Sequence, residues 1–120
     1  MTERLALVVD DNATNRLLAA AILKKLGWSV SEAESGEQAL ALAAKTQFRF
    51  ILLDISMPGL SGEETCTQLR AMPDGRTTCI VAYTAHAFPE ERNRILAAGF
   101  DDMLIKPFSR LQLETLLQGL

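Results

Sequence analysis

The stretch Phe50-Ile51-Leu52-Leu53-Asp54-Ile55-Ser56-Met57-Pro58 decides the fold of this chain. Its apolar residues run without interruption up to Asp54, which is typical of a strand buried on both faces, as in a parallel sheet. Asp54 is therefore expected at the carboxyl end of a strand, the edge at which open α/β sheets bind ligands. Aspartate is also a common turn residue, so Asp54 by itself could simply begin a turn.

The remainder of the chain alternates strand-like and helix-like segments. Apolar runs predict strands over residues 5–9, 28–33, 48–53, 79–83 and 103–105. Each run is followed by a helix-start signal: Asn12 can cap a helix, Ser35, Ser61 and Ser109 each begin a predicted capping box, and Pro89 suits the first turn of a helix. This alternation predicts an α/β fold with a five-stranded parallel sheet, helices on both faces and right-handed crossovers. We expect one domain over residues 1–120.

Composition excludes several classes of protein. The chain has 120 residues, of which 48% are hydrophobic and 22% charged, with a net charge of −3. A basic nucleic-acid-binding surface is not expected, nor is membrane insertion, because no apolar run is long enough. Residues 1–4 lead directly into a strand, so we expect no signal peptide and a cytoplasmic location. The apolar stripe of residues 113–120 is interpreted as core-facing, which favours a monomer.

The few cysteines and histidines argue against two further kinds of site. Cys66 and Cys79 have no metal-ligand spacing and are interpreted as buried, reduced thiols. The single histidine, His86, is too few for a zinc site built from histidines.

Polar residues interrupt the apolar pattern where four of the predicted strands end. These residues are Asp10 and Asp11, Asp54, Thr84, and Lys106. Parallel strands place their carboxyl ends on one edge, and in the flavodoxin-like order 2-1-3-4-5 the first and third strands are neighbours. We therefore expect the three aspartates to lie close together. Taken singly, the acidic pair could cap a helix, Lys106 could be a solvated surface residue and Thr84 an ordinary strand residue.

A cluster of three carboxylates requires a neutralising partner. Two like charges about 4 Å apart repel by roughly 4 kcal/mol at an effective dielectric near 20. Oxygen ligands favour a hard cation, so Mg²⁺ is the expected cofactor. With Lys106 and the hydroxyl of Thr84 nearby, the site would suit phosphoryl oxygens, and Asp54 would be the nucleophile that forms an aspartyl-phosphate.

Over essentially its whole length, the chain resembles the receiver domain of two-component response regulators. The motifs that carry this resemblance are Asp10-Asp11, the segment Leu53-Asp54-Ile55-Ser56-Met57-Pro58-Gly59, Thr84, and Lys106-Pro107. Val9-Asp10-Asp11-Asn12 and Asn15-Arg16 are most similar to receivers of hybrid sensor histidine kinases.

The resemblance implies a role for each site residue. Asp54 would accept a phosphoryl group from a phosphohistidine of a sensor histidine kinase or a histidine phosphotransfer domain. Asp11, Asp54 and the backbone carbonyl of Ser56 would bind Mg²⁺ directly, and Asp10 would act through a metal-bound water. Lys106, aimed by a cis peptide before Pro107, would pair with Asp54 and then with its phosphoryl group.

The resemblance also implies a conformational switch, and here the sequence departs from the family. Thr84 would move onto the phosphoryl group and change the surface formed by the fourth helix, fifth strand and fifth helix. The family usually has an aromatic residue three positions before the lysine, where this chain has Met103. We therefore expect a weaker or differently built response. The resemblance implies that Ser56 and His86 flank the site at positions that tune the lifetime of the phosphoryl group, although His86 could equally be a partly exposed loop residue with no role.

Two other functions stay open from sequence. A Mg²⁺-dependent phosphatase could use Asp54, but such enzymes usually place a second acid two residues later, where this chain has Ser56. The second open function is a docking domain that is never phosphorylated. We expect the signalling domain, which catalyses only its own phosphorylation and dephosphorylation and is not an enzyme in the ordinary sense.

Overall fold

The structure is a computed structural model, and it describes residues 4–73, 75–85, 88–118 and 120. The elements in chain order are β1 (Leu5–Val9), α1 (Ala13–Lys25), β2 (Ser29–Ala33), α2 (Gly36–Ala43), β3 (Phe50–Asp54), α3 (Gly62–Ala71), β4 (Cys79–Thr84), α4 (Pro89–Ala97), β5 (Asp102–Ile105) and α5 (Arg110–Leu117). None of the helices in this described part combines the length and apolar character that a membrane span requires.

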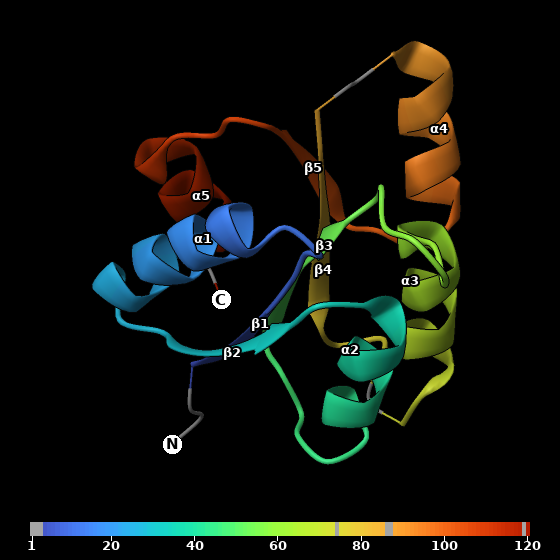
Figure 1. Ribbon diagram of the computed structural model, residues 1–120, viewed down its shortest axis with the longest axis horizontal. Helices are drawn as coiled ribbons and strands as arrows, with labels where there is room; N and C mark the ends of the chain where they lie inside the picture. Colours follow the sequence, from blue (N-terminus) through green and yellow to red (C-terminus); the bar gives the residue numbers. More distant parts are fainter. Residues whose placement is uncertain (1–3, 74, 86–87, 119) are drawn as a thin grey trace.

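The five strands form one parallel sheet in the order β2-β1-β3-β4-β5. Helices α1 and α5 cover one face, and α2, α3 and α4 cover the other (Figure 1). The predicted fold class and strand order are therefore confirmed. The order places β1 beside β3, with Val9 opposite Leu53, so the residues that follow these two strands are neighbours.

Residues of the central strands alternate between two hydrophobic clusters, one on each face of the sheet. Ile51 and Leu53 pack under α2, α3 and α4, whereas Phe50 and Leu52 pack under α1 and α5. All five residues of β3 are buried. Burial on both sides is the reason that this strand is an uninterrupted apolar run.

Two strands begin later than predicted. β2 begins at Ser29 rather than at residue 28, and β3 begins at Phe50 rather than at residue 48. The carbonyl of Phe48 accepts a hydrogen bond from the Thr78 hydroxyl at 3.0 Å instead of joining the ladder. Phe48 and Trp28 are nevertheless buried, which explains why they extend the apolar pattern beyond the strands.

Side-chain caps begin four of the five helices. Reciprocal capping boxes are present at Ser61 and Ser109, as predicted. At Ser35 only half of the predicted box forms, because the Gln38 side chain accepts a hydrogen bond from the backbone N–H of Glu34, not from that of Ser35.

Both cysteines are free thiols. Cys66 is buried, as expected, but Cys79 is only half-buried because it lies at the start of β4. Burial raises the pKa of each thiol to about 11, so both stay protonated at neutral pH.

Candidate functional site

The polar strand ends meet at the carboxyl edge of the sheet. Asp10 follows β1, Asp54 ends β3 and Thr84 ends β4, with exposed fractions of 0%, 3% and 4%. Lys106 follows β5, and its backbone N–H donates to the Thr84 carbonyl at 2.8 Å. Polar side chains this deeply buried require partners, and Lys106 lies within ion-pair distance of both Asp10 and Asp54.

The three aspartates converge on one point. One carboxylate oxygen from each of Asp10, Asp11 and Asp54 lies within 4.8 Å of the other two, and Asp11 is the exposed member. The backbone N–H of Asn12 donates to Asp10 Oδ1 at 2.9 Å, and the Arg16 guanidinium donates to the Asp10 carbonyl at 2.9 Å. These two contacts fix both the side chain and the backbone of Asp10 at the β1–α1 junction.

The Lys106 ammonium lies between the two buried carboxylates. Its Nζ is 3.4 Å from Asp54 Oδ2 and 3.5 Å from Asp10 Oδ2. The Lys106–Pro107 peptide bond is cis, as the resemblance implied. The cluster combines one ammonium with three carboxylates, so these four side chains together keep a net negative charge.

The two buried carboxylates differ in pKa because their partners differ. Burial raises the pKa of Asp54 to about 6, since the Ser56 N–H and the Lys106 charge offset the desolvation only in part. For Asp10, burial also acts to raise the pKa, but hydrogen bonds from Tyr83 and Asn12 outweigh it and hold the pKa below its usual value. Asp10 is thus the more firmly ionised member of the pair.

The β3–α3 loop passes close behind Asp54. The backbone N–H of Ser56 donates to Asp54 Oδ1 at 3.0 Å. At Gly62, the first residue of α3, a Cβ would lie 2.6 Å from the Asp54 carbonyl oxygen and 2.8 Å from Ile55 Cα. Both are backbone atoms, so a side chain at residue 62 would displace the segment that carries Asp54.

Tyr83 belongs to this site, although the sequence pattern indicates only a strand residue. Its hydroxyl donates a hydrogen bond to Asp10 Oδ2, and Lys106 Nζ lies 4.3 Å from the centre of its ring. Burial and the nearby carboxylates raise the pKa of Tyr83, so the phenol stays protonated and remains a donor. The available signal was a lone tyrosine directly before Thr84 in an otherwise aliphatic strand.

Two predicted residues remain, Met103 and His86. Met103 is half-buried in β5 and packs against the cluster under α2, α3 and α4. His86 lies outside the described residues.

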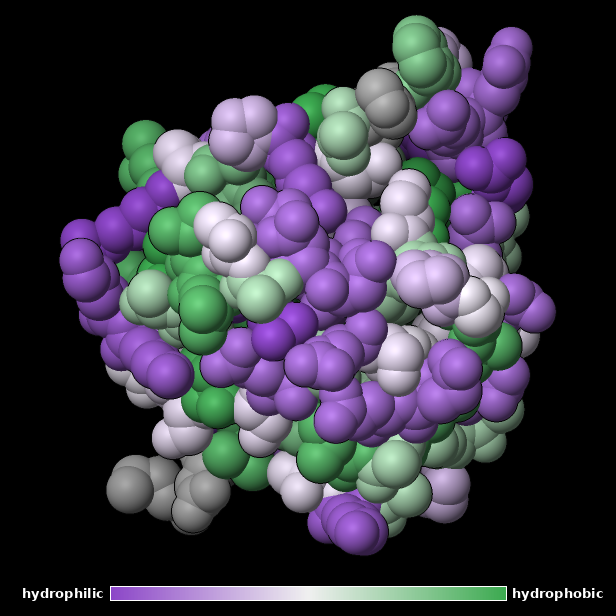
Figure 2. All heavy atoms as spheres, in the orientation of Figure 1, coloured by the Kyte–Doolittle hydropathy of each residue, from purple (hydrophilic) through white to green (hydrophobic). Residues whose placement is uncertain are grey.

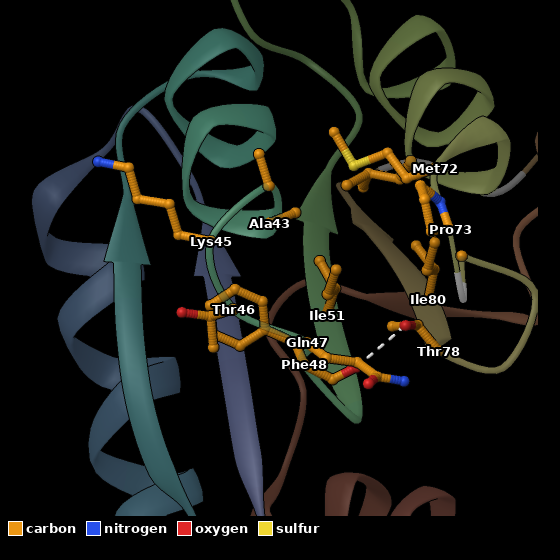
Figure 3. A pocket seen from close by; sticks show the side chains of 13 residues that line it. Ala43, Lys45, Thr46, Gln47, Phe48, Ile51, Met72, Pro73, Thr78 and Ile80 are labelled. Carbon is orange, nitrogen blue, oxygen red and sulfur yellow. Dashed lines mark hydrogen bonds between the residues drawn. The ribbon is translucent and has the colours of Figure 1, made fainter.

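A pocket of about 370 Å³ lies at the opposite, amino-terminal edge of the sheet (Figure 3). Its walls come from the α2–β3 connection, the end of α3 and the start of β4, including Phe48, Met72 and Thr78. Among the residues that the structure describes, its lining includes none of the predicted site residues.

The aspartate cluster fits a hard divalent cation. Its ligands are carboxylate oxygens, two of the three are almost fully buried, and Lys106 offsets only part of their charge. Oxygen donors of this kind are those that Mg²⁺ takes in proteins.

Comparisons with solved structures identify receiver domains with the same fold. The chemotaxis protein CheY4 of Vibrio cholerae matches with a TM-score of 0.92 and 32% identity, covering 98% of each chain. The receiver domain of the sensor histidine kinase PA1611 of Pseudomonas aeruginosa matches with a TM-score of 0.89 and 36% identity, covering 98% of this chain and 96% of that one. The latter structure has a magnesium ion coordinated in its active-site cleft.

Sequence relatives include much longer sensor kinases. The chain is 37% identical over 111 residues to the histidine-protein kinase BarA of Shigella flexneri, covering 92% of this chain but 12% of that protein. It is 44% identical over 106 residues to the virulence sensor protein BvgS of Bordetella pertussis, covering 84% of this chain and 9% of that protein. The chain thus corresponds to a small part of these relatives.

The sequence model of the response regulator receiver domain matches residues 6–118, which is nearly all of the chain. The aspartate cluster, the cis Lys106–Pro107 bond and the sheet order agree with that match. This chain belongs to the response regulator receiver domain family, the signalling domains of two-component systems.

Proposed function

We propose that this domain is a phosphoacceptor switch in which Asp54 accepts a phosphoryl group from a phosphohistidine. The observation that carries the proposal is the position of the Asp54 carboxylate. It ends a fully buried strand, 3.4 Å from the Lys106 ammonium and in one oxygen cluster with Asp10 and Asp11. A buried carboxylate beside a fixed positive charge suits a nucleophile whose product is an anion.

The transfer would proceed in one displacement. A carboxylate oxygen of Asp54 forms the new O–P bond while the P–N bond to the donor histidine breaks, and the imidazole leaves with the bonding electron pair. Lys106 offsets the charge on the phosphoryl oxygens. Asp11, Asp54 and the Ser56 carbonyl would hold Mg²⁺, with Asp10 acting through water. When bound, Mg²⁺ supplies charge neutralisation for both the acid cluster and the phosphoryl group.

The hydrophobic surface beside the site supports docking of a helical partner. Leu17 and Leu18 of α1 and Leu111 of α5 are exposed by 58%, 61% and 68%. Helices α1 and α5 lie side by side, and apolar side chains gather over α1 (Figures 1 and 2). We propose that this surface receives a histidine kinase or histidine phosphotransfer domain, and that the chain acts within a hybrid sensor kinase in the cytoplasm.

The output would be a change in the α4–β5–α5 surface. Thr84 ends β4 in register with Ile105, so movement of its hydroxyl toward a phosphoryl group would act on β5 directly. Met103 lies in the same strand, where its unbranched side chain can pack in more than one way. We propose a modest surface change that does not depend on rotation of an aromatic ring. Ser56 and His86, which follow Asp54 and Thr84 by two positions in the sequence, would tune the phosphoryl lifetime.

One experiment separates this function from its alternatives. The protein is incubated with Mg²⁺ and acetyl phosphate and examined by intact mass spectrometry. We expect a single phosphoryl adduct that is labile to hydroxylamine, is absent without Mg²⁺ and is lost in Asp54→Asn. Multiple turnover of varied phosphomonoesters would indicate a phosphatase instead. No adduct with any small phosphodonor or with a phosphohistidine partner would indicate a docking domain.

A further inference from the structure

We propose that Tyr83 is a positioning residue that holds Asp10 through its hydroxyl and Lys106 through its ring. This inference rests on the proposed phosphoacceptor function of Asp54. It assigns two separable tasks to one side chain: the hydroxyl supports the metal-binding carboxylates, and the ring supports the ammonium that faces the phosphoryl group.

The hydroxyl contact fixes the Asp10 carboxylate without neutralising it. Asp10 is fully buried, and Tyr83 is 1% exposed, so water cannot replace the phenol as a donor. The Asn12 N–H occupies Asp10 Oδ1, and the Tyr83 hydroxyl occupies Oδ2. A neutral donor orients the carboxylate and leaves its negative charge available to a cation, whereas a closer ammonium would cancel that charge.

The ring contact restrains Lys106. Lysine has a long, flexible side chain, and that of Lys106 is 21% exposed, so its ammonium needs a local restraint. The Tyr83 ring lies 4.3 Å from Nζ, within the range of a cation–π interaction. Phe108 packs edge-on against the same ring, with centroids 6.1 Å apart and planes at 81°, so the ring is itself held in place.

Tyr83 is not a displaced version of the aromatic switch that Met103 lacks. Tyr83 packs with the cluster under α1 and α5, whereas Met103 packs with the cluster on the other face of the sheet. Tyr83 is also engaged on three sides, by Asp10, Lys106 and Phe108. The contacts describe a fixed support and not a ring that changes position.

Two substitutions separate the two tasks, and a third provides the control. Tyr83→Phe removes the hydroxyl and keeps the ring, Tyr83→Leu removes both, and Val81→Ala removes buried volume from the same strand and cluster. For each variant, Mg²⁺ affinity is measured by calorimetry, the phosphorylation rate at saturating Mg²⁺ by mass spectrometry with acetyl phosphate, and folding by circular dichroism and urea unfolding.

We expect the substitutions to affect the Mg²⁺ affinity and the phosphorylation rate differently. In Tyr83→Phe, Asp10 Oδ2 loses the neutral donor that orients it, so Mg²⁺ binding weakens by about tenfold. The rate at saturating Mg²⁺ stays within about twofold, because the ring still holds Lys106 in place. In Tyr83→Leu the affinity falls similarly and the saturated rate also falls, by about fivefold or more. Val81→Ala should be less stable than wild type but unchanged in both readouts.

Two results would overturn the inference: wild-type Mg²⁺ affinity in Tyr83→Phe, or losses in Val81→Ala equal to those in Tyr83→Leu. If Tyr83→Leu does not fold, the nearly isosteric Tyr83→Phe decides by its Mg²⁺ affinity. If the wild type forms no adduct, the proposed function fails, whereas the Mg²⁺ affinities still decide whether Tyr83 positions Asp10.

Discussion

The Lys106 ammonium lies 3.4 Å from the Asp54 carboxylate. The two residues come from the ends of β5 and β3, which β4 separates in the sheet. The same nitrogen lies 3.5 Å from Asp10, so one positive charge is shared by two buried negative charges. One ammonium cannot neutralise both carboxylates, so metal binding, phosphorylation and stability should each depend on the charge at this site.

Removal of the ammonium should affect phosphorylation more than metal binding. In Lys106→Ala, Mg²⁺ binding by Asp11, Asp54 and Ser56 is expected to persist, because the competing positive charge is gone. Phosphorylation by acetyl phosphate should slow by about tenfold or more, since one interaction with the phosphoryl charge is lost. Calorimetry and mass spectrometry measure the two effects.

Lys45→Ala is the matched control for this change, because Lys45 lines the pocket at the opposite edge of the sheet. It should match the wild type in both assays. Complete loss of Mg²⁺ binding in Lys106→Ala would contradict the role given to the lysine.

The raised pKa of Asp54 predicts a pH-dependent stability in the absence of metal. Burial raises this pKa from 3.8 to about 6, so the folded protein binds the proton more tightly than the unfolded chain does. That contribution is complete below about pH 4 and is lost as pH rises through about 6. Asp10 acts in the opposite direction, but its lowered pKa places its effect below 3.8.

The measurement is the free energy of unfolding in urea and EDTA for wild type and Asp54→Asn. Between about pH 4 and pH 7, the wild type should lose up to about 3 kcal/mol relative to the variant. Mg²⁺ should restore this stability in the wild type only. If the free energy of unfolding depended on pH in the same way for both proteins, folding would not raise the pKa of Asp54.

Gly62 should not tolerate a side chain. The Cβ of Gly62→Ala would meet the backbone of Asp54 and Ile55 at 2.6 and 2.8 Å, so we expect a loss of about 1–3 kcal/mol in stability. Because the displaced segment carries Asp54 and the Ser56 carbonyl, Mg²⁺ affinity should fall as well. Urea unfolding and calorimetry test the two effects.

Ser61→Ala is the control for Gly62→Ala, since it weakens the start of the same helix without crowding Asp54. Loss of the capping box should cost about 1 kcal/mol. Mg²⁺ affinity should stay at the wild-type value. A Gly62→Ala protein with normal affinity would show that the loop accommodates a methyl group.

Met103 predicts a muted response in the output surface. On phosphorylation by acetyl phosphate, we expect small backbone NMR shift changes across α4 and β5 in the wild type. Met103→Phe should enlarge them, because a rigid ring at this half-buried position has to move when its neighbours repack. Met103→Leu is the control and should resemble the wild type. Large changes in the unmodified protein would disprove the muted response.

Much of the fold was predictable because it depends on local pattern. The uninterrupted run ending at Asp54 and the capping residues Ser61 and Ser109 identify a buried parallel strand and two helix starts without any tertiary information. The strand starts at residues 28 and 48 were wrong because Trp28 and Phe48 are buried outside the ladder. Burial and strand pairing leave the same apolar signal in a sequence.

The position of the site was likewise determined by the sequence itself. Parallel strands place all their carboxyl ends at one edge of the sheet, and the side chains found there are Asp10, Asp54, Thr84 and Lys106. The contribution of Tyr83, the tight approach of Gly62 and the raised pKa of Asp54 were decided by the tertiary structure alone. Tyr83 and Asp10 are 73 residues apart, and contacts between residues so distant leave no periodicity to detect. Their chemistry depends on burial and on distances of a few ångströms, and only the packed chain sets these.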